Sequence, residues 1–191
     1  LAMPNSVENL NEAEVITQVQ TNFLGTVFCS QAVIPLLRGG DNPRIINISS
    51  ASAWHYDEMS HLSIYAATKA AGELLCFNYF HLFKISTNAL RFFTVYGPRQ
   101  RPDMAIHKFT ALIDQGKPVP FYGDGSTERD YTFYSDIIAG IVASIDRDLG
   151  FEIFNLGESR TTTLSQLVAL MWLQFVSAAT GSRSACTPPG S

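Results

Sequence analysis

One stretch of the chain, IYAATKAAGELL at residues 64–75, decides the fold. Its alanines and leucines favour an α-helix, and residues four apart in a helix lie on the same face. The spacing therefore predicts that Tyr65 and Lys69 lie one turn apart, with the phenol beside the ammonium. A nearby cation lowers the pKa of a tyrosine from about 10, which suits proton transfer near neutral pH. Because the same spacing occurs on ordinary solvated helix faces, a catalytic role needs support from the neighbouring sequence.

An apolar segment upstream of this helix ends in several hydroxyl groups. Residues 44–52 read RIINISSAS. The β-branched side chains predict a buried parallel strand whose carboxyl end carries Ser49, Ser50 and Ser52. Ligands of open α/β sheets bind at the carboxyl ends of their strands. The sequence thus predicts a site built from strand-end serines and the helix that follows.

The composition is that of a globular protein with a sizeable core. The chain has 191 residues, of which 46% are hydrophobic and 16% charged, and its formal net charge is −4. This mild charge argues against a general nucleic-acid or membrane surface, and no stretch is apolar for long enough to span a membrane. The three cysteines stand far apart without metal-ligand spacing. We therefore expect buried thiols in a reducing, cytoplasmic compartment and no metal site.

Strands and helices alternate along the chain, which predicts an α/β fold with a largely parallel sheet. Asn22 and Gly25 lie within the first expected helix although both disfavour helix interiors. After about residue 175 the sequence loses periodicity and becomes rich in Ser, Ala, Thr, Gly and Pro, so residues 176–191 are predicted to be a disordered tail. Helices are expected at residues 11–37, 64–84, 104–115, 135–146 and from 163, and strands at 44–50, 87–93, 119–122 and 151–155.

The serine strand followed by Tyr65 and Lys69 resembles the catalytic triad of the short-chain dehydrogenase/reductase superfamily. The segment FTVYGPRQRPDM at residues 93–104 is similar to UDP-glucuronate 4-epimerases in the extended, NAD-dependent epimerase/dehydratase branch. This resemblance implies NAD as cofactor and a Rossmann-like, doubly wound parallel sheet. No Gly-x-x-Gly-x-x-Gly phosphate loop follows a strand. The chain therefore looks N-terminally truncated, and we expect it to lack the first strands of that sheet.

The resemblance also implies roles for the residues of the expected site. Tyr65 would remove the proton of a sugar 4-hydroxyl, and Lys69 would bind the nicotinamide ribose. Ser50, at the second position of its serine pair, would hydrogen-bond the reacting oxygen and stabilise its charge. The residues implied to contact the cofactor are Asn22, Ser49, Tyr65, Lys69 and Val95.

Two guanidinium groups predict an anion site. Arg99 and Arg101 follow a strand in a Gly- and Pro-rich loop, and arginine binds carboxylates bidentately. An exposed basic loop is the alternative interpretation. In the resemblance, Thr94 and Arg101 match residues that hold the C6 carboxylate of a uronic acid. A held carboxylate keeps a 4-keto uronate from losing CO₂, which would separate an epimerase from a decarboxylase.

The resemblance further implies that Arg129 contacts the nucleotide diphosphate and that Ser52 contacts the substrate. From the residues alone, an ion pair from Arg129 to Asp130 or Asp136 is an equally open interpretation. The sequence also departs from the family, since residues 53–55 read AWH where Val-Tyr-Gly is usual, and the loop to Tyr65 is short. These departures leave the exact sugar open.

We therefore expect an NAD-dependent nucleotide-sugar epimerase that acts on UDP-glucuronate through a 4-keto intermediate. The alternatives are a 4,6-dehydratase or uronate decarboxylase on the same scaffold, and an inactive fragment that serves as a binding or dimerisation module. Residues 1–95 are expected to form the later part of the dinucleotide-binding domain, and residues 96–175 mainly the substrate-binding part, with some elements returning to the main sheet. The expected partners are a UDP-sugar and a second copy of the chain, since family members dimerise through the two corresponding helices.

Overall fold

The structure, a computed structural model, describes residues 2, 7–54, 63–121 and 123–179. It forms two compact units, Leu1–Phe93 with Ser135–Gly157, and Thr94–Tyr134 with Glu158–Ser191. The first unit contains η1 (Val7–Asn9), α1 (Glu12–Val19), η2 (Gln20–Leu24), α2 (Gly25–Leu37), β1 (Arg44–Ser50), η3 (Ala51–Ala53), α3 (Ser63–Phe83), β2 (Ser86–Phe92), α5 (Tyr134–Ile145) and β5 (Phe151–Leu156). The second contains β3 (Thr94–Tyr96), α4 (Ala105–Asp114), β4 (Glu128–Phe133), β6 (Thr161–Thr163) and α6 (Leu164–Ala179).

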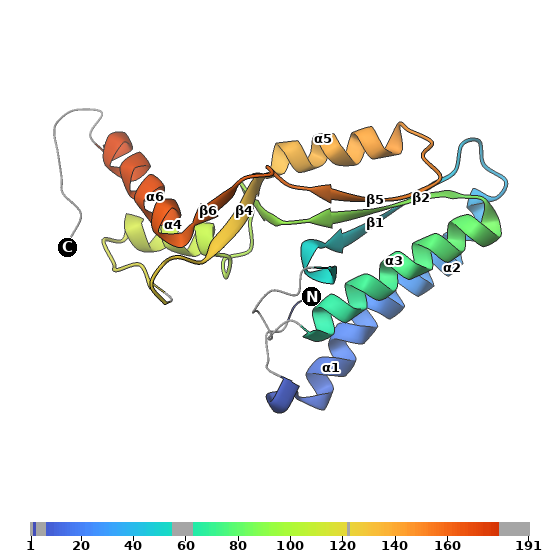
Figure 1. Cartoon of the computed structure of the whole chain (residues 1–191), viewed down its shortest axis with the longest axis horizontal. Helices are drawn as coiled ribbons and strands as arrows, with labels where there is room; N and C mark the ends of the chain where they lie inside the picture. The colour runs from blue at the N-terminus through green and yellow to red at the C-terminus, as the bar shows by residue number, and fades with distance from the viewer. Residues whose placement is uncertain (1, 3–6, 55–62, 122, 180–191) are drawn as a thin grey trace. The chain divides into compact units, whose positions relative to one another are not determined.

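A parallel three-stranded sheet in the order β1-β2-β5 forms the centre of the first unit (Figure 1). The register pairs Ser50 with Phe92, and Phe92 with Leu156, so the three strands end at the same edge. This arrangement confirms the prediction of an α/β fold with a parallel sheet. It also places the end of the serine strand at the edge where ligands of such sheets bind.

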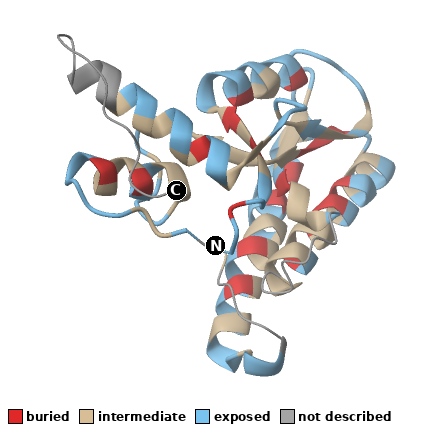
Figure 2. Cartoon of the chain, turned by 60° about the vertical axis from the view of Figure 1, so that its left-hand side comes forward, coloured by how far each residue is buried: buried red, intermediate tan, exposed pale blue. Residues whose placement is uncertain are grey.

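Helices cover both faces of this sheet. The helices α2 and α3 lie on one face and α5 on the other (Figure 1), and α3 packs against both β1 and β2. The middle strand is consequently the core, with Ala89 and Leu90 fully buried. Figure 2 shows buried residues along the strands and on inward helix faces, with exposed residues on the outer helix faces. Because both faces of β2 are covered, its residues from Ser86 to Leu90 are all buried, the polar ones included.

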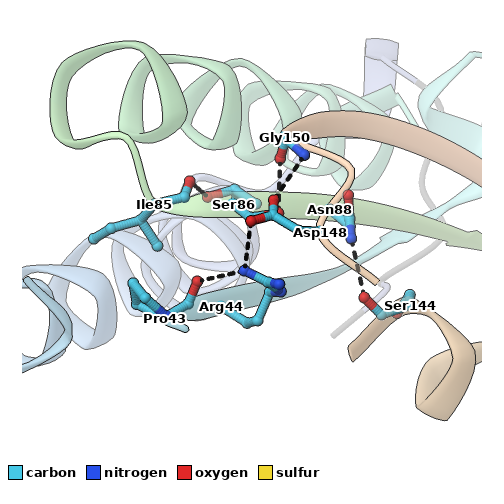
Figure 3. A network of polar contacts seen from close by, with 9 residues as sticks. Pro43, Arg44, Ile85, Ser86, Asn88, Ser144, Asp148 and Gly150 are labelled. Carbon is cyan, nitrogen blue, oxygen red and sulfur yellow. Dashed lines mark hydrogen bonds and ion pairs between the residues drawn. The ribbon is translucent and has the colours of Figure 1, made fainter. Parts of the chain in front are cut away.

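Polar contacts join the strands at the opposite, amino end of the sheet (Figure 3). An Nη1 atom of Arg44 lies 3.4 Å from a carboxylate oxygen of Asp148. The carbonyl of Gly150 accepts hydrogen bonds from the backbone nitrogen of Thr87 at 2.7 Å and from the hydroxyl of Ser86 at 3.2 Å. These contacts hold the starts of β1, β2 and β5 together, away from the serine end.

The predicted helix at residues 11–37 runs from Glu12 to Leu37, but its middle is not α-helical. Residues Gln20–Leu24 form a π-helical segment between α1 and α2. Asn11 caps the start, because its side-chain oxygen accepts a hydrogen bond from the backbone nitrogen of Ala13 at 2.9 Å. A π-helical turn changes which side chains face the neighbouring helix, and such turns are frequent at functional sites.

The second unit contains a small mixed sheet in the order β3-β4-β6. Strand β4 pairs in parallel with β3 and antiparallel with β6, and α4 packs against α6. The prediction of a strand at residues 119–122 is wrong, since residues 117–121 form no regular element and Tyr122 lies outside the described residues. Residues 119 and 120 are Val and Pro, and proline cannot donate to a strand ladder.

Two further expectations are corrected. The tail predicted at residues 176–191 is helical at its start, because α6 continues to Ala179, while residues 180–191 lie outside the described part. Of the cysteines expected to be buried, Cys76 is buried but Cys29 is exposed. Cys29 lies on the outer face of α2, where the apolar residues of that helix also reach the surface. Cys186 falls beyond the described residues.

Candidate active site

The centre of the candidate site is the contact between the end of β1 and the start of α3. Helix α3 packs against β1 and against η3, the short turn that follows it. The ammonium of Lys69 donates a hydrogen bond to the carbonyl of Ile48 at 2.8 Å, and its nitrogen lies 5.8 Å from the centre of the Tyr65 ring. Lys69 is thus bonded to the strand end, and the ring of Tyr65 lies near its ammonium from the preceding turn of the same helix.

Lys69 is a half-buried cation. Burial lowers the pKa of its ammonium below the ordinary value of 10.5, because an apolar environment disfavours the charged form. The bond to the Ile48 carbonyl offsets part of this desolvation. A lysine held in this way presents a positive charge at a fixed place rather than on a freely moving surface side chain.

Asn22 is linked to the first turn of α3 by a chain of hydrogen bonds. Its side-chain nitrogen donates to the hydroxyl of Thr68 at 3.2 Å, and that hydroxyl donates to the carbonyl of Tyr65 at 2.7 Å. Asn22 and Thr68 are both buried. The π-helical segment therefore directs a buried amide at the turn that carries Tyr65. Thr68 was not singled out from the sequence, although its place between Tyr65 and Lys69 is the signal that could have identified it.

The three serines at the end of β1 have different environments. The hydroxyl oxygen of Ser50 accepts a hydrogen bond from the backbone nitrogen of Ser52 at 3.2 Å, so Ser50 caps the turn that follows the strand. A serine hydroxyl also carries a donor, which leaves Ser50 able to donate to a bound oxygen. The hydroxyl of Ser49 donates to Glu73 at 2.6 Å. The predicted contact of Ser49 with a cofactor would have to share that hydroxyl with Glu73.

Glu73 and Arg91 were not identified from the sequence. The carboxylate of Glu73 on α3 accepts two hydrogen bonds from the guanidinium of Arg91 on β2, at 2.8 and 2.7 Å. Each charge stands alone in an otherwise apolar segment, AAGELLC and NALRFF. Charged residues are almost never buried without a partner. Two opposite charges in two buried elements are therefore the sequence signal for such a pair.

In the second unit, β3 and the loop after it carry residues that the sequence predicts to contact the ligands. Thr94 and Val95 lie on β3, and the carbonyl of Val95 accepts a hydrogen bond from the side chain of Gln100 at 2.9 Å. Arg99 adopts a left-handed backbone conformation with φ of 66°, which is uncommon for a residue with a side chain. The loop that carries the two arginines is thus a defined turn closed onto β3.

Arg101 is exposed and weakly paired. Its guanidinium lies 3.0 Å from the carboxylate of Asp103, and the two side chains are 57% and 67% exposed. The same nitrogen is 3.7 Å from the sulfur of Met104. An ion pair this exposed contributes little because water and salt screen it. Arg101 can therefore exchange Asp103 for another carboxylate at small cost.

Arg129 lies on β4 beside a buried carboxylate that is occupied by other donors. Asp130 accepts hydrogen bonds from the backbone nitrogens of Glu158 and Ser159, each at 3.0 Å, and from the hydroxyl of Thr132 at 2.9 Å. These bonds anchor β4 to the turn that leads into β6. The Asp130 carboxylate thus accepts three hydrogen bonds from other parts of the second unit.

The part of the chain that the structure describes offers neither a metal-binding cluster nor a membrane-spanning helix. Among its residues, no group of three or more His, Cys, Asp and Glu side chains is arranged to hold a metal ion. Nor does any helix in the described ranges combine the length and hydropathy needed to cross a bilayer.

The chain belongs to the NAD-dependent epimerase/dehydratase family, whose model matches residues 31–157. The matched region contains β1, α3, β2, α5 and β5, the elements that build the parallel sheet and its serine end. The chain is 43% identical over 111 residues to a UDP-glucuronate 4-epimerase of Thermodesulfobacterium geofontis. That match covers 58% of this chain and 34% of the relative, so the chain corresponds to only part of the length of its relatives.

Solved structures show the same fold. A UDP-glucuronic acid 4-epimerase from Bacillus cereus, in complex with UDP-glucuronic acid and NAD, matches with a TM-score of 0.74 and 30% identity over 96% of this chain and 58% of that one. A UDP-N-acetylglucosamine 4-epimerase from Methanobrevibacter ruminantium matches with a TM-score of 0.73 and 26% identity over 89% of this chain and 57% of that one. These likenesses confirm the Rossmann-like α/β fold and the resemblance to nucleotide-sugar epimerases.

Proposed function

We propose that the chain is the catalytic part of an NAD-dependent nucleotide-sugar epimerase. The observation that carries this proposal is the fixed ammonium of Lys69, half-buried, bonded to the end of β1 and one turn from Tyr65. Family membership and the likeness to a 4-epimerase complexed with UDP-glucuronic acid and NAD support it. The organisation proposed from the sequence, with cofactor residues mainly before residue 95 and substrate residues mainly after it, remains part of the proposal.

The residues around Lys69 fit the nicotinamide end of NAD. A buried ammonium is a donor suited to ribose hydroxyls, and the hydroxyl at the end of β1 adds a further polar group. Bound NAD would supply reversible hydride transfer at a sugar carbon. Lys69 would hold the ribose, and Asn22 would keep the first turn of α3 in place through Thr68. Val95 and Ser49 are the other residues that the family resemblance implies for the cofactor, although the Ser49 hydroxyl already donates to Glu73.

The chemical work proposed for the chain itself is proton transfer. Tyr65 would take the proton of the sugar 4-hydroxyl and later return it to the 4-keto oxygen, once the keto sugar has turned so that hydride comes back to the opposite face of C4. The positive charge of Lys69 would stabilise the negative charge on the phenol oxygen. Ser50 would donate to the reacting sugar oxygen and stabilise its developing charge.

We propose UDP-glucuronate as the substrate. Arg101 with Thr94 would hold the C6 carboxylate, and the exposed pair of Arg101 with Asp103 is a carboxylate contact that a uronate could replace. Arg129 would contact the diphosphate, and Ser52 would contact the sugar. Similar proteins include both UDP-glucuronate and UDP-N-acetylglucosamine 4-epimerases, so the carboxylate contact is the feature that decides between these substrates.

The test begins with the cofactor. The purified chain would be denatured and the released solution assayed for NAD, and the native chain would be incubated with UDP-glucuronate and analysed by NMR. About one NAD per chain and formation of the C4 epimer are expected. Release of CO₂ with a UDP-pentose would indicate a decarboxylase, and a 4-keto-6-deoxy product from UDP-glucose a dehydratase. Neither cofactor nor turnover would leave the chain as a binding module.

The variant Tyr65→Phe separates catalysis from binding. Without the phenol hydroxyl we expect turnover to fall by about 10²- to 10⁴-fold, the usual contribution of a general acid–base group. Retained NAD should remain near the level of the unchanged chain, because the ring and Lys69 stay in place. Unchanged turnover would reject Tyr65 as the base.

We also propose that the chain forms a homodimer through α2 and α3. These helices pack side by side, and large apolar side chains on them are exposed. Exposed apolar residues that gather on one surface indicate an interaction site. Analytical ultracentrifugation should find a dimer, and a monomer at all concentrations would contradict the proposal. The exposed residues are Phe28, Val33 and Leu36 on α2, and Leu74, Phe77 and Leu82 on α3.

A further inference from the structure

A buried ionic cluster lies directly behind the candidate active site. Glu73 is 6% exposed, and its two carboxylate oxygens accept one hydrogen bond each from the Nε and Nη2 atoms of Arg91. The hydroxyl of Ser49 donates to the same carboxylate at 2.6 Å. The cluster therefore joins α3, β2 and β1 within one set of hydrogen bonds. Donating these hydrogen bonds to Glu73 raises the pKa of Arg91, so the guanidinium stays charged.

The contacts between β1 and α3 follow one another along the strand. A Cβ atom at Gly72 would stand 3.2 Å from the side-chain nitrogen of Asn47, so the glycine lets helix and strand approach closely. The carbonyl of Ile48 then meets Lys69, and the Ser49 hydroxyl meets Glu73. Ser50 is the next residue of the strand. The helix is thus bonded to the two residues that immediately precede the candidate catalytic serine.

Stabilisation of the fold alone does not account for this buried ionic cluster. Burying an ion pair carries a desolvation penalty, and replacing such a pair by packed apolar residues is often neutral or stabilising. A bidentate arginine–carboxylate pair does, however, fix direction and distance. What the cluster offers beyond apolar packing is therefore a fixed register between α3, β1 and β2.

We propose that Glu73 is a positioning residue that holds the end of β1 in register with α3, so that Ser50 is presented correctly to the reaction carried out by Tyr65. Glu73 acts through Ser49 on one side and is itself held by Arg91 on the other. This inference rests on the proposed function. It also assigns the Ser49 hydroxyl a role within the protein, in place of the cofactor contact implied by the family resemblance.

The first variant is Glu73→Gln, which keeps the shape and one acceptor oxygen but removes the charge that holds Arg91. We expect kcat to fall by about 10²-fold, since a displacement of about 1 Å can have that effect. The KM for the nucleotide sugar and the amount of retained NAD should stay unchanged, because no group that binds them is removed. An unchanged kcat in a folded variant would overturn the proposal.

A double-mutant cycle with Ser49→Ala tests the route of the effect. If Ser49 acts through Glu73, the double variant should lose no more activity than the more impaired single variant, and NAD retention should not change. If Ser49 contacts the cofactor instead, Ser49→Ala should lower NAD retention and the two losses should multiply. That second result would overturn the assigned route.

The matched control is Asp148→Asn, in the loop before β5, whose carboxylate pairs with Arg44 at the other end of β1. It removes the ion pair with Arg44, which also ties β1 to its surroundings, but lies at the amino edge of the sheet (Figure 3). We expect its kcat to match that of the unchanged chain. An equal loss of kcat in this control would show a general effect of weakening β1, and would overturn a role specific to Glu73.

Hydrogen exchange read by mass spectrometry tests positioning without relying on activity. In Glu73→Gln, backbone exchange should become faster at residues 48–54 and 63–69 and stay unchanged at 134–157. A uniform increase across these segments would mean that the cluster only stabilises the fold. If the unchanged chain shows no turnover, the proposed function fails and this measurement alone decides the inference. Should Glu73→Gln not fold, Arg91→Lys, which keeps the charge but not the two-point grip, replaces it with the same expected pattern.

Discussion

At the scale of single residues, Lys69 combines burial with a charge that the proposed reaction needs. Because its pKa lies below 10.5 in the folded chain, the folded state releases this proton more readily than the unfolded state. The contribution of Lys69 to stability therefore rises with pH between its lowered pKa and 10.5. At neutral pH the charged lysine is kept at some expense of stability, as expected for functional groups.

This lowered pKa predicts an alkaline limit to activity. We expect turnover to decrease as the pH rises through the pKa of Lys69, at a pH below the 10.5 of an ordinary lysine. The pH dependence of kcat/KM in the free enzyme would report it. The variant Lys69→Arg stays charged throughout this pH range. Where it retains turnover, the decrease of activity at alkaline pH should be absent. A decrease that persists unchanged in this variant would assign it to another group.

The two described cysteines should differ sharply in reactivity. Burial, with the nearby negative charge of Glu73, raises the pKa of the Cys76 thiol to about 12, whereas Cys29 is exposed. Only the thiolate is nucleophilic. Iodoacetamide at pH 8 should therefore label Cys29 readily and Cys76 only after unfolding, as peptide mass spectrometry would show. Labelling of Cys76 at the rate of Cys29 would contradict the burial of α3 against the sheet.

The sequence identified single candidate residues only where their chemistry depends on a local spacing along the chain. Tyr65 and Lys69 stand four apart on a helix, so their neighbourhood followed from helical geometry alone. Glu73 and Arg91 come from different elements, and their pairing depends on how α3 crosses the sheet. No local sequence pattern predicts how α3 crosses the sheet. The polar groups behind the site therefore emerge only when the packing of helix on strand is known.

At the scale of elements, predictions were accurate where hydrophobic runs were long. The helix at 64–84 and the strands at 44–50 and 87–93 agree with α3, β1 and β2 within a few residues. The π-helical segment was not foreseen, because the propensities of residues 20–24 say only that the helix is weak there. The segment carries the contact of Asn22 with Thr68, which involves another helix and does not show in a local pattern.

The second sheet was missed for a different reason. Strand β4 buries Asp130 and Thr132 rather than apolar residues, so its alternation does not show in hydropathy. Strands β3 and β6 have three residues each, too few for a period-two pattern to be read. The sheet of the second unit thus buries polar side chains on β4, which hydropathy periodicity does not report.

The link between β2 and α5 gives a prediction for stability. Asn88 is fully buried, and its side-chain nitrogen donates to the carbonyl of Ser144 at 3.2 Å. Asn88→Ala should lower the free energy of unfolding by about 1–3 kcal/mol, since it leaves a buried carbonyl without that donor. Urea unfolding would measure the change.

The matched control is Asn78→Ala on α3. Asn78 also donates to a backbone carbonyl, that of Leu74 at 2.9 Å, but at an exposed position, where water can replace the bond. We expect its free energy of unfolding to stay within about 0.5 kcal/mol of the unchanged chain. Equal losses of unfolding free energy in the two variants would contradict a specific contribution of the buried hydrogen bond from Asn88 to Ser144.

At the scale of the whole molecule, the two units interleave along the sequence. The first unit takes residues up to Phe93 and returns for Ser135–Gly157. The return supplies β5, which pairs with the whole length of β2 from Thr87 to Phe92, and whose Phe151 ring meets Phe77 edge-on at 5.4 Å. The middle strand β2 therefore gains one of its two neighbouring strands, β5, from a segment that is synthesised well after it.

Shortening the chain should reveal this dependence. A chain that ends after residue 146 lacks β5, so β2 has an open edge and an uncovered apolar surface, and we expect loss of cooperative thermal unfolding and strong binding of a hydrophobic dye. A chain that ends after residue 157 keeps every element of the first unit and should retain protected amides in β1 and β2. Similar behaviour of the two chains would contradict the role assigned to β5.

The interleaving also bears on how the protein is made. During synthesis β1, α3 and β2 leave the ribosome before β5, and the intervening residues 94–134 belong to the other unit. Translation proceeds at about 5–20 residues per second, so the fully buried strand of the finished protein spends several seconds with one side open. A nascent chain in that state offers an unpaired strand edge to chaperones or to neighbouring nascent chains, and the pace of translation between residues 93 and 156 becomes a determinant of yield.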